Sequence, residues 1–383
     1  MEEKKERKAG MPKKQLIGAL ACIVAVGALI GVTGGIFKSN ATEQEVIYPS
    51  EFVTEVRQLS QYHASLAGTS GDTLVYVIKG EQEGGSTLVL GGTHANEISG
   101  HMAAILLVER AQVTKGTLYV IVRTNNSGFT YNDPGDAAPT WVHVNTPSGT
   151  RKFKYGSRAT SPLDQWPDPD AYVNVAGQTL SGGEVRNLNR AYPGKADGTL
   201  TEQIAYAIVQ LIKTEDITMT IDLHEASPEY PNINATVAHE RAMSIASIGT
   251  MNMLTAGVEI KLEPSPVNLR GLTHRELGDF TDTYALLMET ANAAQGRTRG
   301  ATNEKLAITG QDKCYELLVN YGLLYVPYDE NGHPLEERVG RHLQGIAEYT
   351  KALTMLEPEN AVEIVNIPSY NELMDSTLGA WLR

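Results

Sequence analysis

The chain has 383 residues, of which 42% are hydrophobic and 20% are charged, so it can bury a sizeable core as one large domain or two small ones. Its 45 acidic and 32 basic residues give a formal net charge of −13, which argues against nucleic acid as a partner. It has two cysteines, and because Cys22 falls in an apolar segment, it does not pair with Cys314 inside one domain.

The N-terminus predicts a membrane anchor. A head rich in Lys and Arg, residues 1–14, precedes an apolar run over residues 15–37 that carries no charged residue. At about 1.5 Å per residue, a helix of that length spans a hydrocarbon core of roughly 30 Å. The cationic head predicts a cytoplasmic N-terminus, which puts the rest of the chain outside. The competing interpretation is a signal peptide cleaved after the small residues Ser39-Asn40-Ala41, which gives a secreted protein.

The next part of the chain predicts a strand–helix–strand unit. A polar linker over residues 38–55 leads to strands at Thr73–Ile78 and Ser86–Leu90, both rich in β-branched residues. Apolar residues at helical spacing predict a helix over Ile98–Arg110, and Thr117–Val122 is a further strand. This order indicates a crossover connection in a mixed or largely parallel sheet.

The segment over residues 125–183 does not continue this alternation of strands and helices. It is rich in Gly, Pro, Asp, Ser and aromatic residues and is too long for a simple connection. Two interpretations stand side by side, a wall or lid over a pocket and a surface excursion with its own apolar cluster. Beyond it, the pattern predicts helices at Leu200–Lys213, Arg241–Leu254, Asp312–Tyr321 and Leu335–Thr354, and strands at Ile217–Leu223, Ile233–Ala238 and Tyr284–Met288.

These elements predict an α/β fold. We expect a single domain with a mixed, mostly parallel, twisted sheet flanked by helices, preceded by one transmembrane helix. The catalytic domain is predicted over residues 56–302, with residues 125–183 as a loop or lid insertion. Residues 303–383 are predicted as a helical flank of the same domain.

The stretch Gly91-Gly92-Thr93-His94-Ala95-Asn96-Glu97 carries the clearest chemistry. It lies between a buried strand and a helix, so His94 and Glu97 stand at the carboxyl end of a strand, where open α/β sheets bind ligands. The two glycines let the backbone turn sharply at this corner. An imidazole and a carboxylate at this spacing can reach one ion together, and the pair suits Zn²⁺.

His224 is the candidate third ligand, because it directly follows the strand Ile217–Leu223 and so lies at the same sheet edge. A hydrolytic zinc needs three protein ligands and one open position. Asp222 lies two residues earlier on the same strand face, where it either orients an imidazole or is an ordinary strand-edge residue. The alternative to a metal site is that His94 caps a turn and His224 is a satisfied polar residue.

Glu289 is the candidate general base. It ends the apolar strand Tyr284–Met288, so it too points into the crevice at the sheet edge. A lone carboxylate after apolar residues has no evident structural role, but it is well placed to transfer a proton. Glu225, beside His224, is the rival base, but its side chain is expected to leave the strand in the opposite direction.

Four motifs, in this order, resemble the signature of zinc carboxypeptidases. The nearest match is the succinylglutamate desuccinylase/aspartoacylase branch, and the resemblance covers roughly residues 60–300. The motifs are Gly91-Gly92-Thr93-His94-Ala95-Asn96-Glu97, Asn187-Leu188-Asn189-Arg190-Ala191-Tyr192-Pro193-Gly194, Asp222-Leu223-His224-Glu225 and Leu287-Met288-Glu289-Thr290.

The resemblance implies one zinc ion per chain, held by His94, Glu97 and His224, and a catalytic Glu289. It also implies that Asn189 and Arg190 hold a substrate carboxylate, which suits arginine because its planar guanidinium pairs both oxygens. A solvated turn arginine is the alternative for Arg190.

The sequence departs from the family pattern in two places. Asn187 stands where many relatives have Asp, and no motif fixes the arginine that polarises the scissile carbonyl. Arg186 and Arg123 are both candidates, and we expect Arg186 near the substrate. Basic residues before the Glu289 strand could also line the pocket, although a basic surface loop is the favoured interpretation; these are Arg270, His274 and Arg275.

The resemblance implies a zinc-dependent amide hydrolase that acts next to a carboxylate, with an N-acyl amino acid as the favoured substrate. An outward-facing domain makes a metallocarboxypeptidase on peptides or cell-wall peptides the alternative. A non-catalytic binding module on the same fold is a second alternative, against which the retained ligands and Glu289 argue. Nothing in the sequence selects a sugar, which disfavours a sugar deacetylase.

Overall fold

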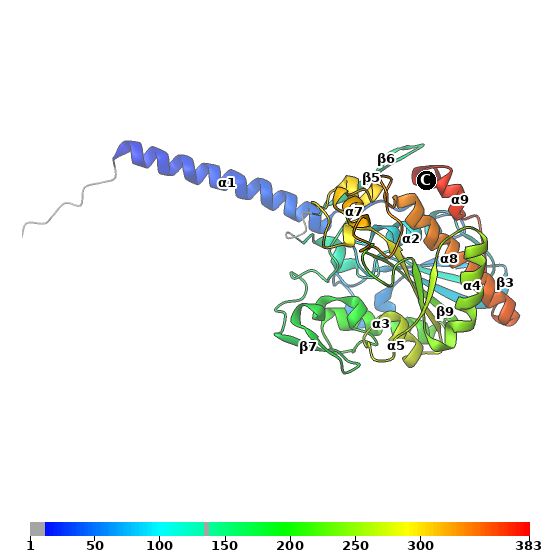
Figure 1. The fold of residues 1–383 in the computed structure, drawn as a ribbon. Coiled ribbons are helices and arrows are strands. Elements are labelled where there is room, and N and C mark those ends of the chain that lie inside the picture. The colour runs from blue at the N-terminus through cyan, green and yellow to red at the C-terminus, as the bar shows by residue number, and fades with distance from the viewer. Residues whose placement is uncertain (1–11, 134–137) are drawn as a thin grey trace, which may run out of the picture. The chain divides into compact units, whose positions relative to one another are not determined.

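The structure is a computed structural model that describes residues 12–133 and 138–383, and it divides into two units, Met1–Glu43 and Gln44–Arg383 (Figure 1). Most of the cationic head predicted over residues 1–14 lies outside the described residues, so the orientation inferred from it stays a prediction. The domain boundaries predicted inside the second unit also stay predictions.

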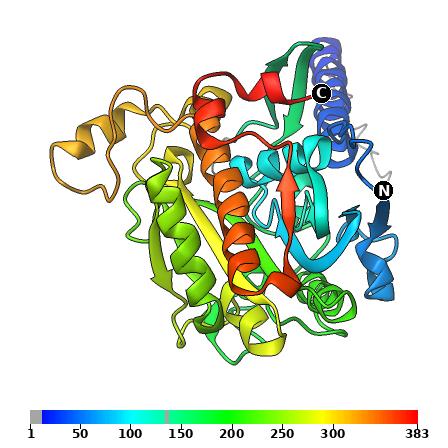
Figure 2. The same cartoon turned by 90° about the vertical axis from the view of Figure 1, so that its right-hand side faces the viewer.

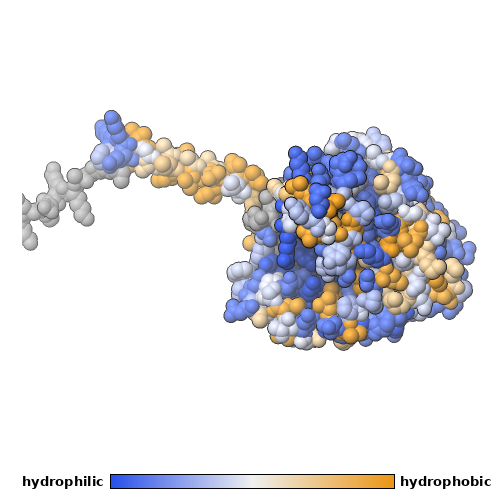
Figure 3. Space-filling view, in the orientation of Figure 1, coloured by the Kyte–Doolittle hydropathy of each residue, from blue (hydrophilic) through white to orange (hydrophobic). Residues whose placement is uncertain are grey.

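The first unit contains the helix α1 (Lys13–Thr42), which includes the apolar run. Its length and composition are sufficient to cross a membrane, although a signal sequence has the same properties. None of its described residues is buried, and Figure 3 shows a largely hydrophobic surface along it. A helix that is apolar all round needs an apolar environment, such as lipid.

The second unit is built on a mixed nine-stranded sheet in the order β1-β2-β4-β3-β9-β12-β10-β11, with β13 paired to β4. The four central strands, β4, β3, β9 and β12, run parallel, and antiparallel pairs flank them. The strands are β1 (Glu55–Gln58), β2 (Leu74–Lys79), β3 (Gln82–Leu90), β4 (Gln112–Ile121), β9 (Met219–Ala226), β10 (Ala235–Ala238), β11 (Lys261–Pro264), β12 (Tyr284–Ala291) and β13 (Glu363–Val365). The predicted fold class is confirmed.

Helices cover both faces of this sheet. They are α2 (Ile98–Arg110), α3 (Leu200–Thr214), α4 (Met243–Thr255), α5 (Thr273–Phe280), α6 (Glu304–Thr309), α7 (Lys313–Val319), α8 (Leu335–Leu356), α9 (Tyr370–Met374) and α10 (Leu378–Trp381). Side chains from α2, α4 and α8 pack on one face in a first apolar cluster, and α3 and α5 contribute to a second cluster on the other. Figure 2 shows α8 crossing the first face.

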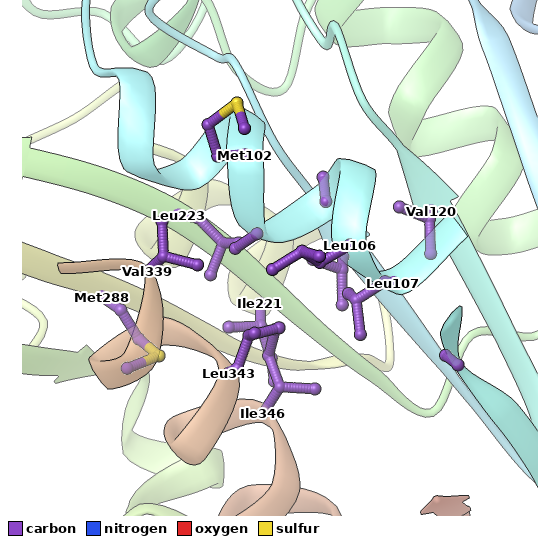
Figure 4. Packing of buried hydrophobic residues seen from close by; sticks show 14 of the residues in the cluster. Met102, Leu106, Leu107, Val120, Ile221, Leu223, Met288, Val339, Leu343 and Ile346 are labelled. Atoms are coloured by element: carbon purple, nitrogen blue, oxygen red, sulfur yellow. The ribbon is translucent and has the colours of Figure 1, made fainter. Parts of the chain in front are cut away.

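The first cluster holds α2 and α8 firmly against the centre of the sheet. In Figure 4, Leu106 of α2 and Leu343 of α8 meet Ile221 and Leu223 of β9. Alternate residues of a strand face opposite sides, so Val89 belongs to this cluster while Leu88 and Leu90 belong to the second. Burial of both faces explains why these strands read as nearly continuous apolar runs.

Glycine allows α2 to approach β9 more closely than any other residue would. A Cβ on Gly100, in the first turn of α2, would lie 2.5 Å from the carbonyl oxygen of Leu223. No side chain fits there, so the helix backbone rests directly on the strand. This contact brings the start of α2 to the end of β9, where the candidate ligands stand.

The segment 125–183 contains two hairpins, β5 (Trp141–Thr146) with β6 (Gly149–Lys154) and β7 (Ala171–Val173) with β8 (Thr179–Ser181). Its buried side chains Val142, Phe153 and Tyr155 join the first cluster. The first of the two hairpins is thus packed on the main core.

Candidate metal centre

Neighbouring strand ends bring the candidate residues to one edge of the sheet. β9 lies between β3 and β12, with Leu90 opposite Asp222 and Glu289 opposite His224. His94 and Glu97 follow β3 in the turn into α2, where Gly92 has a φ of +66°, a conformation that favours glycine. The structure therefore gathers residues that are far apart in sequence, as expected from the strand pattern.

The three candidate ligands converge on one point. His94, Glu97 and His224 are buried, and the Nδ1 atoms of the two histidines lie 2.8 and 2.9 Å from the two carboxylate oxygens of Glu97. The two Nδ1 atoms are 3.2 Å apart. One ligand atom from each residue lies within 4.8 Å of the others, a spacing at which they can hold one ion.

Acceptors on the far side of each ring set its orientation. Nε2 of His94 lies 2.9 Å from Oδ1 of Asn187, and Nε2 of His224 lies 2.8 Å from Oδ2 of Asp222. An acceptor at Nε2 keeps the proton there, so Nδ1 presents its lone pair to the convergence point. The orientation of the Asn187 amide follows from its Nδ2, which donates to Oε2 of Glu184 at 2.7 Å.

Asn187 thus fills, as a neutral acceptor, the place where the family resemblance led us to expect Asp. Asp222, the corresponding acceptor for His224, is fully buried and accepts two further hydrogen bonds, from the hydroxyls of Thr93 at 2.7 Å and Thr273 at 2.6 Å. Of the two interpretations of Asp222, the structure supports the one in which this carboxylate orients an imidazole.

The charges at the convergence point call for a cation. When both imidazoles are neutral, two lone pairs and a carboxylate face one another and repel, so the site favours a positive charge, either a metal ion or a proton on His224. Burial lowers the pKa of His94 to about 4. Burial alone would also lower the pKa of His224, but Asp222 and Glu97 hold it well above its ordinary value. The residues present fit a divalent ion with nitrogen and oxygen ligands, and the set of donors suits Zn²⁺.

Glu289 faces the same cavity with one unused acceptor. Its Oε2 atom is buried and has no hydrogen-bond partner among the described residues. Burial raises the pKa of Glu289 to about 8. A carboxyl group with this pKa and a free oxygen can take and return a proton near neutral pH.

The cavity has a volume of about 620 Å³, and its walls carry charges of both signs. Asn189 and Arg190 line it, together with Glu97 and Glu289. Nη1 of Arg190 donates to the backbone carbonyl of Asn189 at 2.6 Å, which holds the guanidinium at the wall. Burial lowers the pKa of Arg190 from its ordinary value, but a guanidinium stays charged at any pH of interest.

Arg158 is a cavity residue that the sequence analysis missed. Its Nη1 atom lies 3.0 Å from Oε1 of Glu97, and its side chain is 45% exposed. It comes from the long excursion over residues 125–183, where no motif or periodicity marks it. Only the path of the folded chain, which returns to the sheet edge at this point, reveals it.

The two arginines named as candidates for the scissile carbonyl do not line the cavity. The guanidinium of Arg186 pairs with Asp168 at 2.7 and 2.9 Å. Arg123 pairs with Glu45 and lies over the ring of Phe129. The expectation that Arg186 lies near the substrate therefore finds no support, because its charge is already neutralised elsewhere.

The basic residues before β12 are not a surface loop, which corrects the favoured interpretation. Arg275 is buried in α5 and pairs with Asp279 and Glu240, and Arg270 pairs with Glu276. His274 is buried and lines the cavity. Acidic partners, of which Asp279 and Glu276 are close in sequence and Glu240 is distant, offset the burial of the two arginines.

No protein-family model matches the chain, and no curated protein matches its sequence. Similar solved structures include a succinylglutamate desuccinylase from Silicibacter sp. TM1040 (16% identity, TM-score 0.37, covering 76% of this chain and 75% of that one). They also include a succinylglutamate desuccinylase/aspartoacylase from Rhodobacter sphaeroides, with 15% identity and a TM-score of 0.36, covering 68% of this chain and 63% of that one. A third is a metallo-carboxypeptidase from Burkholderia cenocepacia, with 10% identity and a TM-score of 0.45, covering 79% of this chain and 65% of that one. The chain resembles both groups.

Proposed function

We propose that this chain is a zinc-dependent hydrolase that cleaves an amide bond beside a carboxylate, with N-acyl amino acids as its substrates. One observation carries the proposal. The Nδ1 atoms of His94 and His224 and the carboxylate of Glu97 converge at the wall of a cavity lined by His94, Glu97 and Glu289, and one carboxylate oxygen of Glu289 has no partner among the described residues. This is the combination of ligands and base that metal-assisted hydrolysis needs.

His94, Glu97 and His224 would hold the zinc, which when bound supplies a Lewis acid and lowers the pKa of water. Glu289 takes a proton from the attacking water and later delivers it to the leaving amine. In the metal-free chain burial raises its pKa to about 8, which shows that this environment can keep a proton on the carboxyl group near neutral pH.

Two arginines supply the positive charge that an anionic substrate and transition state require. Arg158 stands beside Glu97, and its remaining N–H groups can donate to the oxygen that becomes negative as the amide is attacked. Arg190, at the wall with Asn189, can pair both oxygens of a substrate carboxylate.

The resemblance to the desuccinylase/aspartoacylase branch supports a deacylase over a carboxypeptidase. The helix α1 supports the second candidate, because a domain anchored outside the cell would meet peptides or cell-wall peptides. The membrane location and the ligand roles are part of this proposal.

The deciding experiment uses the full chain in detergent, loaded with zinc, and measures amine release from two panels. One panel contains N-acyl amino acids that differ in acyl group, and the other contains short peptides with free C-termini. Turnover of the first panel supports the proposal. Turnover of the second alone makes the chain a carboxypeptidase. Stoichiometric zinc without turnover of either panel indicates a binding module.

A further inference from the structure

Glu225, the residue after His224, forms a buried ion pair that the proposed hydrolysis does not use. Its Oε1 atom pairs with Nη1 of Arg338, and both side chains are 0% exposed. Its Oε2 atom accepts a hydrogen bond from Nδ2 of Asn292 at 2.9 Å. A fully buried charge pair is costly to desolvate, so its presence directly beside a candidate metal ligand needs an explanation.

Arg338 is held rigidly by the C-terminal part of the chain. It lies in the first turn of α8, where Nε donates to the carbonyl oxygen of His333 at 3.0 Å and Nη2 donates to that of Ala307. Asn292 is fixed as well, because its backbone N–H donates to the carbonyl of Ala226 at 2.8 Å. The carboxylate of Glu225 therefore joins the end of β9 to α8 and to the residue that follows β12.

The backbone of Glu225 contacts the metal site directly. Its N–H donates to Oε2 of Glu97 at 3.0 Å, the same oxygen that lies 2.9 Å from Nδ1 of His224. The other oxygen of Glu97 lies 2.8 Å from Nδ1 of His94. The N–H of Glu225 at Oε2, together with Nη1 of Arg158 at Oε1, thus sets how the Glu97 carboxylate is turned between the two imidazoles.

We infer that the Glu225–Arg338 pair is a positioning device for the metal centre. The ion pair fixes the side chain of residue 225, which fixes its peptide plane, which in turn orients Glu97 toward both histidines. The inference rests on the proposed zinc site but not on any substrate. Through this pair, α8, which lies more than a hundred residues beyond His224, helps to orient the metal ligands.

The test measures zinc affinity by competition with a chromophoric chelator on the full chain. Glu225→Gln keeps the size of the side chain and an acceptor for Asn292, but it leaves Arg338 without its counter-charge. Loss of an outer partner of a metal ligand typically weakens metal binding by 10–100-fold, and we expect the Kd for zinc to rise by about that factor. Arg338→Lys keeps the charge but loses the fork of donors, so a smaller rise is expected.

The matched control is Glu109→Gln, which breaks another buried ion pair, between Glu109 and Arg151. Glu109 is also 0% exposed and stands at the far end of α2 from Glu97. We expect this variant to unfold at a lower temperature with an unchanged zinc Kd. A purely structural role for Glu225 predicts that both variants behave alike.

A double variant, Glu225→Gln with Arg338→Met, guards against a single variant that fails to fold. It removes both charges and keeps an apolar side chain on α8, so no unpaired charge remains buried. The peptide of residue 225 still loses its anchor, and zinc binding is expected to stay weak. Folded variants with wild-type zinc Kd overturn the inference. A wild-type chain without stoichiometric zinc overturns the proposed function as well, and so the two failures are distinguishable.

Discussion

Glu97 and Glu289 are chemically identical side chains that the site gives opposite protonation. Burial by itself would raise the pKa of Glu97, but the imidazoles of His94 and His224 hold it well below the ordinary value. At Glu289, burial outweighs the lowering effect of His224, and the pKa rises to about 8. Environment alone separates a permanently charged ligand from a proton carrier.

Replacement of the proposed base is expected to affect turnover and leave metal binding intact. Glu289→Gln preserves shape and hydrogen bonding but cannot accept a proton, so kcat is expected to fall by roughly 10²–10⁴ with KM little changed. Steady-state kinetics together with zinc content by elemental analysis check this. A zinc-loaded variant with near wild-type kcat contradicts the assignment.

Replacement of each of the two cavity arginines is expected to change a different kinetic parameter. Arg190→Lys keeps the charge but loses the planar fork, so it weakens ground state and transition state alike and raises KM more than it lowers kcat. Arg158→Ala removes donors to the developing oxyanion, so kcat falls by about 10²–10³. Both parameters, measured for both variants on one substrate, separate the roles. If Arg190→Lys lowers kcat alone, Arg190 stabilises the oxyanion and does not bind the substrate carboxylate.

Glu289 also makes the stability of the metal-free chain depend on pH. Its pKa is about 8 when folded and near the ordinary 4.5 when unfolded. Between these values the folded state binds more protons, so the free energy of unfolding falls as pH rises through this window. Denaturant titrations of chelator-treated wild type and Glu289→Gln check this, because their difference isolates Glu289. A difference that does not change with pH over this window contradicts the raised pKa.

At the scale of elements, the close contact of α2 with β9 controls the distance between ligands on different elements. Gly100→Ala places a Cβ against the carbonyl of Leu223, so the helix must move away and carry Glu97 from His224. We expect a loss of about 1–3 kcal/mol in the free energy of unfolding, together with weaker zinc binding. Denaturant titration and chelator competition measure the two effects.

The control for this helix variant is Gly183→Ala, where the nearest atom to the new Cβ lies 3.9 Å away. It adds the same methyl group without a clash, so stability and zinc binding are expected to stay near wild type. Equal behaviour of the two alanine variants would mean that α2 can shift without cost.

The sequence predicts elements well where local pattern and packing agree. The helix Ile98–Arg110 has the predicted bounds, because its apolar spacing and the glycines before it act within a few residues. β9 and β12 read as strands because both of their faces are buried. β9 and β12 carry His224 and Glu289, and His94 and Glu97 stand in the turn just before α2, so the core of the site could be predicted.

The rest depends on contacts between distant residues. α5 reads as a polar loop, and its burial becomes clear only when Glu240 and Asp279 are seen to pair with Arg275. Arg158 stands in an irregular segment whose course is set by packing on the core. β13 has three residues and forms by pairing with β4, far away in the sequence.

For the whole molecule, we predict that α1 stays attached and holds the second unit outside the cell. Its apolar length is sufficient to cross a bilayer, and the cationic head favours the cytoplasmic side. Protease added to intact cells is expected to remove the second unit and leave a short membrane-bound fragment, detected with a tag at the N-terminus. A mature chain whose sequence begins near Thr42 would show cleavage instead.

The packing of α8 on β9 sets the time at which the site can form. Val339, Leu343 and Ile346 of α8 cover Ile221 and Leu223, so the strand that carries His224 lacks part of its core until α8 has been made (Figure 4). During synthesis, the residues of the convergence point emerge long before the helix that covers their strand. We therefore predict that metal loading is a late event, completed in whichever compartment receives the C-terminal half of the chain.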